Sequence, residues 1–133
     1  VGRDWPAELR LLEYGQRLAR QQRNVAADPG QGDGATAAHL FNRHLAGGAA
    51  AAGFGTWGLQ PGARADLLVI DPLADGLAGV PASHVLDALV FATGAPAFAE
   101  VWVAGRRQVD GGRHRRQGVL LADYLGAMAE LWP

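Results

Sequence analysis

The sequence contains no cysteine, no lysine and only one serine. Without cysteine, the chain can form no disulfide, no thiolate zinc site and no cysteine nucleophile. The 12 basic residues are all arginine and are balanced by 13 acidic residues, so nothing indicates binding to nucleic acid or to an anionic membrane. No apolar run reaches the ~20 residues that a membrane-spanning helix needs. We therefore expect a cytoplasmic protein whose partners are neither nucleic acid nor membrane.

What is present predicts a compact domain. The chain has 133 residues, of which 49% are hydrophobic and 19% are charged, and this is enough to bury a core. It begins with Val1 rather than methionine, which leaves its natural start and any targeting segment open.

Periodic apolar residues predict four helices. The first runs over about 5–23, with Asp4 as its cap and Pro6 in its first turn, and the second over about 36–52 before Gly53. Between them, the glycine-rich segment 28–34 predicts a loop. A third helix is expected through 85–90 with Ser83 as its cap, and a fourth from about 117.

Two stretches predict strands. The continuous apolar run over 65–70 is typical of a strand that is covered on both faces. Alternating residues over 98–109, followed by a turn at 110–112, predict a strand and hairpin. So few strands cannot close a barrel or a sandwich, so we expect this chain to be part of a larger fold.

None of the candidate sites has its full context. The segment 53–58 matches GxGxxG, but it follows a helix and opens a strand, whereas a dinucleotide site requires the reverse. The four histidines show no metal-binding motif: His39 and His44 are five residues apart and fall on different helix faces, while His84 and His114 stand alone.

Two further groups of side chains invite a catalytic interpretation. Ser83, His84 and Asp87 resemble the members of a hydrolase triad, but sequence neighbours rarely face one another, so a helix cap is the preferred interpretation of Ser83. Asp66 and Asp71 bracket the strand over 65–70 at ~16 Å from each other, at ~3.3 Å per residue. This separation is too large for paired acid and base catalysis, so both are expected to hold the ends of the strand.

Several segments together resemble one family. The stretch 58–71, GLQPGARADLLVID, is similar to the segment by which amidohydrolase-superfamily enzymes leave their barrel and re-enter a small β-domain built from both chain ends. The stretch 101–109 with 112–114 resembles the closing hairpin of that domain. The stretches 8–18, 23–25, 40–41 with 45–49, and 86–92 are similar to the formimidoylglutamate deiminases of histidine breakdown, so the resemblance covers nearly the whole chain.

The resemblance implies an α/β fold, namely the C-terminal part of a metal-dependent (β/α)8 barrel hydrolase. On this basis we expect the last barrel helices at 1–52, the C-terminal strands of the β-domain at 53–114, with an inserted helix, and a C-terminal helix at 115–133. The implied reaction converts N-formimino-L-glutamate to N-formyl-L-glutamate and ammonia, with a divalent metal, in most cases zinc, activating water. The implied assembly is a homodimer.

No catalytic, cofactor-binding or metal-binding residue of the family can be carried over to this sequence. Asp4 lacks the context of the family's metal-binding aspartate and is expected to cap a helix. The chain alone is therefore expected to be inactive and to bind no metal tightly. Two alternatives stay open: another deaminase of the superfamily, similar to guanine deaminase, or a non-catalytic domain that binds a partner through its strand edges.

Overall fold

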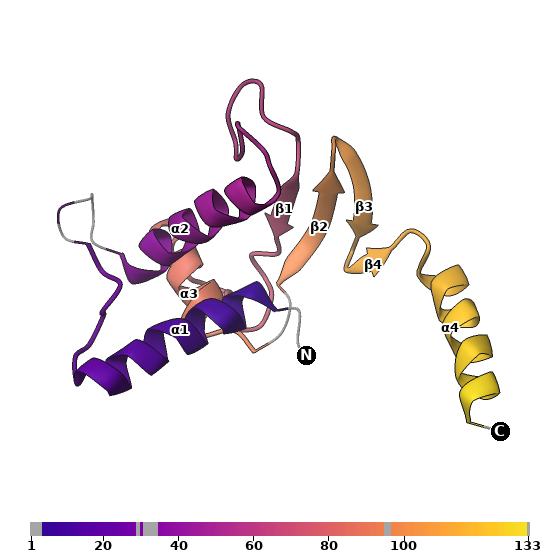
Figure 1. Cartoon of the computed structure of the whole chain (residues 1–133), viewed down its shortest axis with the longest axis horizontal. Helices are drawn as coiled ribbons and strands as arrows, with labels where there is room; N and C mark the ends of the chain where they lie inside the picture. The colour runs from indigo at the N-terminus through magenta and orange to yellow at the C-terminus, as the bar shows by residue number, and fades with distance from the viewer. Residues whose placement is uncertain (1–3, 29, 31–34, 95–96, 133) are drawn as a thin grey trace. The chain divides into compact units, whose positions relative to one another are not determined.

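The computed structural model describes residues 4–28, 30, 35–94 and 97–132. Along the chain (Figure 1), the elements follow in the order α1, α2, β1, a short 3-10 turn, α3, β2, β3, β4 and α4. The chain divides into two units, one made of Val1–Arg64 and Asp71–Ala97, the other of Ala65–Ile70 and Phe98–Pro133. The predicted limits at 52/53 and 114/115 follow from the family resemblance and stay a prediction.

Helix α1 (Trp5–Arg20) begins where the sequence predicts. Asp4 is in an extended conformation, and its Oδ1 accepts a hydrogen bond from the backbone N–H of Ala7 at 3.2 Å, which satisfies a donor of the first turn. The helix ends earlier than the predicted residue 23, because Gln21 takes a left-handed conformation with φ 54°. The expectation that Asp4 caps this helix is confirmed.

Helices α2 (Thr36–Ala51) and α3 (Val85–Phe91) complete the helical unit. The residue before α2, Ala35, provides no side-chain cap; instead, Oδ1 of Asp87 in α3 lies 3.4 Å from the backbone nitrogen of Ala37 and accepts from it. An acidic group at the first turn of a helix also complements the helix dipole. The predicted loop at 28–34 falls mostly outside the described residues.

The three helices share a small apolar core. Each of them packs against the other two. The core centres on four buried residues, and five partly buried apolar residues surround it. Its buried members are Leu9, Ala37, Leu40 and Val90, and the surrounding residues are Trp5, Ala26, Phe41, Leu86 and Phe91.

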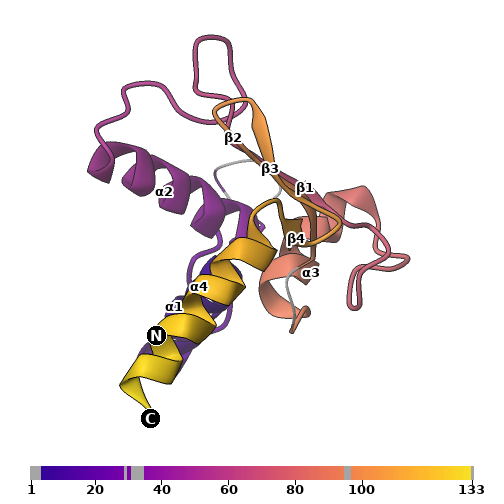
Figure 2. The same ribbon diagram turned by 90° about the vertical axis from the view of Figure 1, so that its right-hand side faces the viewer.

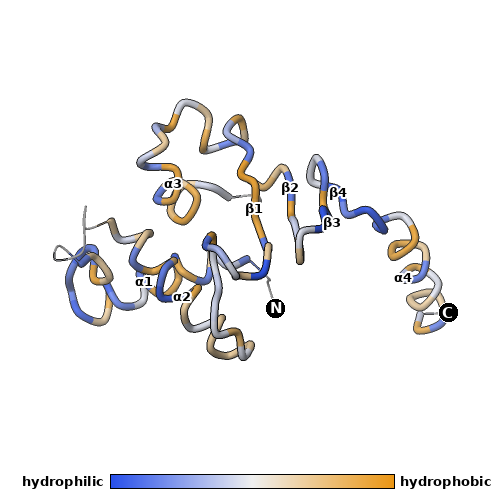
Figure 3. Tube along the Cα trace, turned by 90° about the horizontal axis from the view of Figure 1, so that it is seen from above, coloured by the Kyte–Doolittle hydropathy of each residue, from blue (hydrophilic) through white to orange (hydrophobic). Residues whose placement is uncertain are grey.

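The second unit is built on an antiparallel sheet in the order β1-β2-β3-β4. Its strands are β1 (Leu67–Ile70), β2 (Phe98–Val103), β3 (Arg106–Asp110) and β4 (Arg113–His114). In Figure 3, the tube is coloured hydrophobic at β1 and mostly hydrophilic at β3 and β4.

The segment 98–109, predicted as a strand and hairpin, forms the two strands β2 and β3, and the predicted turn at 110–112 joins β3 to β4. The chain reverses at Ala104 and Gly105, which both have positive φ, of 49° and 73°, so that Val103 pairs with Arg106. Positive φ at both central residues is the geometry of a two-residue hairpin turn. The predicted coverage of β1 on both faces is also not found within this chain, because Leu68 and Val69 keep 45% and 41% of their surface exposed.

The last helix, α4 (Gln117–Leu131), begins at the predicted residue. None of its residues is buried. Met128 is half-buried, and the rest of the helix is exposed. No helix in the described part of the chain combines the length and the apolar character that a membrane crossing requires.

Candidate functional site

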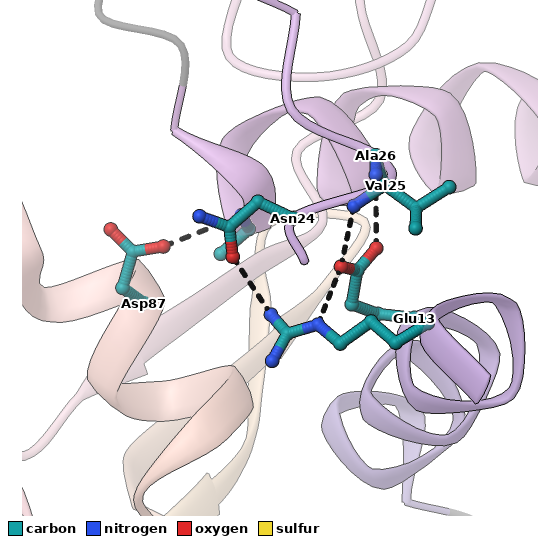
Figure 4. Close-up of polar contacts among 7 residues, drawn as sticks. Glu13, Asn24, Val25, Ala26 and Asp87 are labelled. Atoms are coloured by element: carbon teal, nitrogen blue, oxygen red, sulfur yellow. Dashed lines mark hydrogen bonds and ion pairs between the residues drawn. The ribbon is translucent and has the colours of Figure 1, made fainter. Parts of the chain in front are cut away.

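The best-defined polar centre lies around Glu13, in the middle of α1. The residue is only 1% exposed, and its carboxylate accepts three hydrogen bonds. Arg17 donates through Nε at 2.8 Å, and the backbone N–H groups of Val25 and Ala26 donate at 2.9 and 3.0 Å. Figure 4 shows the two backbone donors converging on the two carboxylate oxygens. Arg17 also donates to Oδ1 of Asn24 at 3.0 Å.

This environment controls the charge of Glu13. Burial by itself raises the pKa of the carboxyl group, because it penalises the charged form. The hydrogen bonds from the Arg17 side chain and from the backbone of Ala26 and Val25, with the charge of Arg17, more than offset this, so the pKa lies below its ordinary value. Glu13 is therefore a buried anion whose two carboxylate oxygens both accept hydrogen bonds, and it holds the segment after α1.

A second polar contact holds α3 against α1. Arg10 donates through Nε to the carbonyl of Val90 at 2.6 Å and through Nη2 to the carbonyl of Thr93 at 2.7 Å. The last carbonyls of a helix have no partner within the helix and carry partial negative charge, so a guanidinium there both satisfies and neutralises them. Thr93 itself donates through its hydroxyl to the carbonyl of Leu89 at 2.7 Å.

The structure does not build a triad from Ser83, His84 and Asp87. Ser83 lies in the 3-10 turn (Ala82–His84), and its hydroxyl contacts Nδ1 of its neighbour His84 at 2.9 Å. Asp87 is engaged with the N-terminus of α2. The prediction that Ser83 caps α3 is also wrong. Ser83 belongs to the 3-10 turn Ala82–His84, so α3 begins at Val85, its cap position is His84, and no side chain caps it.

A groove of about 640 Å³ lies between α1, α2 and the segment 25–28. His39 and His44 both line it, although their spacing places them on different faces of α2. Arg20, Arg43 and Asp28 lie along the same groove. The ring of His44 stacks on that of Trp5 with centroids 6.2 Å apart.

The groove does not assemble a metal centre. Across residues 4–28, 30, 35–94 and 97–132, no group of three or more His, Cys, Asp or Glu side chains is placed to hold a metal ion. His84 and His114 contact residues next to them in sequence. Nδ1 of His84 contacts the hydroxyl of Ser83, and Nδ1 of His114 accepts a hydrogen bond from the backbone N–H of Arg116 at 3.3 Å. The described residues thus do not fit the zinc ligand set that the family resemblance implies.

The two acids that bracket β1 hold its ends. Oδ1 of Asp66 accepts from the backbone N–H of Ala104 at 2.6 Å, which ties the start of β1 to the β2–β3 turn. Oδ1 of Asp71 accepts from the N–H of Leu73 at 2.9 Å, a local turn that ends the strand. The predicted structural role of both aspartates, at the ends of the strand, is confirmed.

The segment that matches GxGxxG connects α2 to the loop before β1. Residues 53–58 follow α2 and continue into an open loop (Figure 2), with Gly53 at φ 74° and Gly58 at φ 96°. Phe54 and Trp57 pack against each other with ring centroids 4.8 Å apart. A phosphate-binding turn would instead end at the N-terminus of a helix.

Comparison with known proteins shows what the chain is similar to. No protein-family model matches the chain. The chain is 39% identical to formimidoylglutamate deiminase from Pseudomonas aeruginosa over 125 residues, which is 93% of this chain. Among solved structures, an amidohydrolase from Brucella melitensis matches 96% of the chain with a TM-score of 0.81 and 38% identity.

The chain spans about a quarter of the length of these relatives, 27% in each case. The expected architecture, helices with an antiparallel sheet that match one part of an amidohydrolase, is confirmed by the solved relative. In sequence and in fold, the chain resembles part of an amidohydrolase and is a relative of formimidoylglutamate deiminase.

Proposed function

We propose that this chain is the C-terminal part of a hydrolase that converts N-formimino-L-glutamate to N-formyl-L-glutamate and ammonia in histidine degradation. The single observation that carries the proposal is the 39% identity to formimidoylglutamate deiminase across 93% of the chain. The solved amidohydrolase supports the hydrolase class independently through its fold.

The chain itself contributes structure to this enzyme. The polar groups around Glu13 and Arg10 are engaged in contacts within the helical unit. The divalent metal, which we propose to be zinc, and the groups that activate water lie outside residues 1–133 in this proposal. We also propose that the whole enzyme is a cytoplasmic homodimer acting on a small molecule.

The decisive experiment compares two proteins. The first is the 133-residue chain, and the second is the product of the complete open reading frame, which we expect to encode a His-x-His motif upstream of Val1. We expect the longer protein to release ammonia from N-formimino-L-glutamate and to lose this activity in a chelator, whereas the chain alone is inactive. Ammonia release by the isolated chain would contradict the proposal that the metal and the groups that activate water lie outside residues 1–133.

The same ammonia-release assay distinguishes the proposed enzyme from another deaminase of the superfamily. Guanine is the control substrate, because the strand motifs 58–71 and 101–114 are shared across the superfamily. Turnover of guanine without turnover of the formimino acid would assign the protein to another deaminase. A start codon immediately before Val1 would favour a free-standing, non-catalytic domain.

A further inference from the structure

The groove between α1, α2 and the segment 25–28 has the dimensions of a small-molecule site. Its volume of about 640 Å³ lies within the ~300–1,000 Å³ that such sites occupy. All of its lining residues belong to the unit that contains the three packed helices. The groove is therefore formed by contacts that the structure describes within one unit of the chain.

The lining of the groove combines buried apolar residues with exposed cations. Leu9 of α1 and Leu40 of α2 line it and are each only 6% exposed, because both belong to the helical core. Arg20 of α1 and Arg43 of α2 also line it, and both are exposed. A ligand in the groove can thus contact hydrocarbon and reach one guanidinium from each helix.

The two arginines keep donors that their contacts within the chain do not use. Arg20 donates through Nε to Oε1 of Gln16 at 3.1 Å, which orients its guanidinium. Within the described part of the chain, no hydrogen bond or ion pair engages the Nη atoms of Arg20 or the side chain of Arg43. His39 precedes Arg43 by four positions on α2, so the two side chains share one helix face, and both line the groove.

The acids of the groove do not cancel this positive charge. Glu13 is already matched by Arg17, whose Nε lies 2.8 Å from its carboxylate. Asp28 is the second acid of the lining, and its Oδ1 accepts from the backbone N–H of Gly30 at 3.0 Å. Two arginines thus stand against one acid without a matching cation, and protonation of the histidines of the groove adds to the excess. Such an excess favours an anionic ligand.

We propose that the groove binds a small dicarboxylate, with one carboxylate on Arg20, the other on Arg43, and the carbon chain against the leucines of the lining. A guanidinium matches a carboxylate through two parallel N–H donors. Because the two cations come from different helices, a ligand with two anionic ends uses both of them. A compact anion such as phosphate would leave the apolar lining without a contact. The inference does not rest on the proposed function, since it uses only contacts within the helical unit.

Chemical modification of arginine in the complete gene product tests this site directly. Phenylglyoxal modifies accessible arginines, and mass spectrometry of the peptides gives the rate at each position. The probe is glutarate, at several times the dissociation constant of about 1 mM that two charge-assisted contacts support. We expect Arg20 and Arg43 to react at least about threefold more slowly with glutarate present, because bound ligand shields them. Arg113, which is exposed in β4, is the control and should keep its rate. Glutaramide, the neutral diamide of the same carbon chain, should protect neither arginine of the groove.

A matched pair of variants tests whether the two arginines bind one ligand. Arg43→Gln should raise the glutarate concentration that half-protects Arg20 at least about tenfold, since one charge-assisted contact is lost. Arg113→Gln should leave that concentration unchanged.

Three results would overturn the proposal. The first is unchanged protection of Arg20 in Arg43→Gln, and the second is equal protection, or none, at Arg20, Arg43 and Arg113. The third is that Arg20 and Arg43 do not react even before glutarate is added, because another part of the protein would then cover the groove. None of these readouts uses turnover, so a negative result would refute this inference and leave the proposed function intact.

Discussion

Helices α1 and α4 have nearly the same length, 16 and 15 residues, and opposite relations between composition and burial. Helix α1 is rich in charged residues, yet it buries a glutamate almost completely. Helix α4 has a long row of leucines and an adjoining tryptophan, and it buries nothing. Burial in this chain therefore depends on whether a neighbour is available, and hydrophobicity alone does not predict it.

The largest expected effect comes from matched leucine truncations in the two helical regions. Leu40→Ala should lower the free energy of unfolding of the 133-residue protein by about 3 kcal/mol, because it leaves a cavity beside Leu9 and Val90. Leu125→Ala should change it by less than about 0.5 kcal/mol, since that side chain contacts mainly solvent. Urea denaturation followed by circular dichroism measures both. If Leu125→Ala lowered the free energy of unfolding as much as Leu40→Ala, the proposed difference in burial between α4 and the helical core would be wrong.

The next effect tests the buried charge. Glu13→Ala removes the acceptor for Arg17, Val25 and Ala26, and should lower the free energy of unfolding by about 2 kcal/mol. The loss is moderated because Val25 and Ala26 are only half-buried, so water can replace part of the carboxylate. Glu8→Ala, at an exposed position of the same helix, is the control and should lower the free energy of unfolding by less than about 1 kcal/mol, because it loses only the interaction of a first-turn acid with the helix dipole. Similar losses in the two variants would show that Glu13 has no special role.

The smallest expected effect is the pH dependence of the same contact. Because the folded-state pKa of Glu13 lies below its unfolded value, its contribution to stability is complete above the ordinary value of 4.5 and is lost as the pH falls through the folded-state pKa. The wild-type protein should therefore lose stability in acid more steeply than Glu13→Gln. Thermal melts between pH 3 and pH 6 compare the two slopes. A steeper acid dependence in Glu13→Gln would reverse the assigned direction of the shift.

Local signals predicted much of the secondary structure. Asp4 with Pro6, the apolar spacing of α2, and Asp66 and Asp71 at the ends of β1 all act through contacts close in sequence or through simple periodicity. The turn at Ala104 escaped prediction because alanine at positive φ has no sequence signature, and the alternation of apolar residues continued through it.

The polar centre could not be predicted, because it depends on tertiary contacts. In the sequence, Glu13 and Arg17 form an ordinary i,i+4 pair, which is typical of a solvated helix face. Only the return of the segment 24–26 over α1 makes the carboxylate a buried acceptor. The same holds for Arg10, whose partners at Val90 and Thr93 lie 80 or more positions away.

The junction between β1 and β2 has a consequence for how the sheet forms. Ile70 pairs with Phe98, although the whole segment 71–97 lies between them, and a hydrogen bond of 2.8 Å from the N–H of Asp71 to the carbonyl of Ala97 closes that segment at its base. The β2–β3 hairpin can form quickly from neighbouring residues, whereas β1 can join it only after this long loop has closed. The connections between the strands thus set the order in which the sheet assembles. Changing the length of segment 71–97 should alter the folding rate of the sheet more than it alters the structure of the strands.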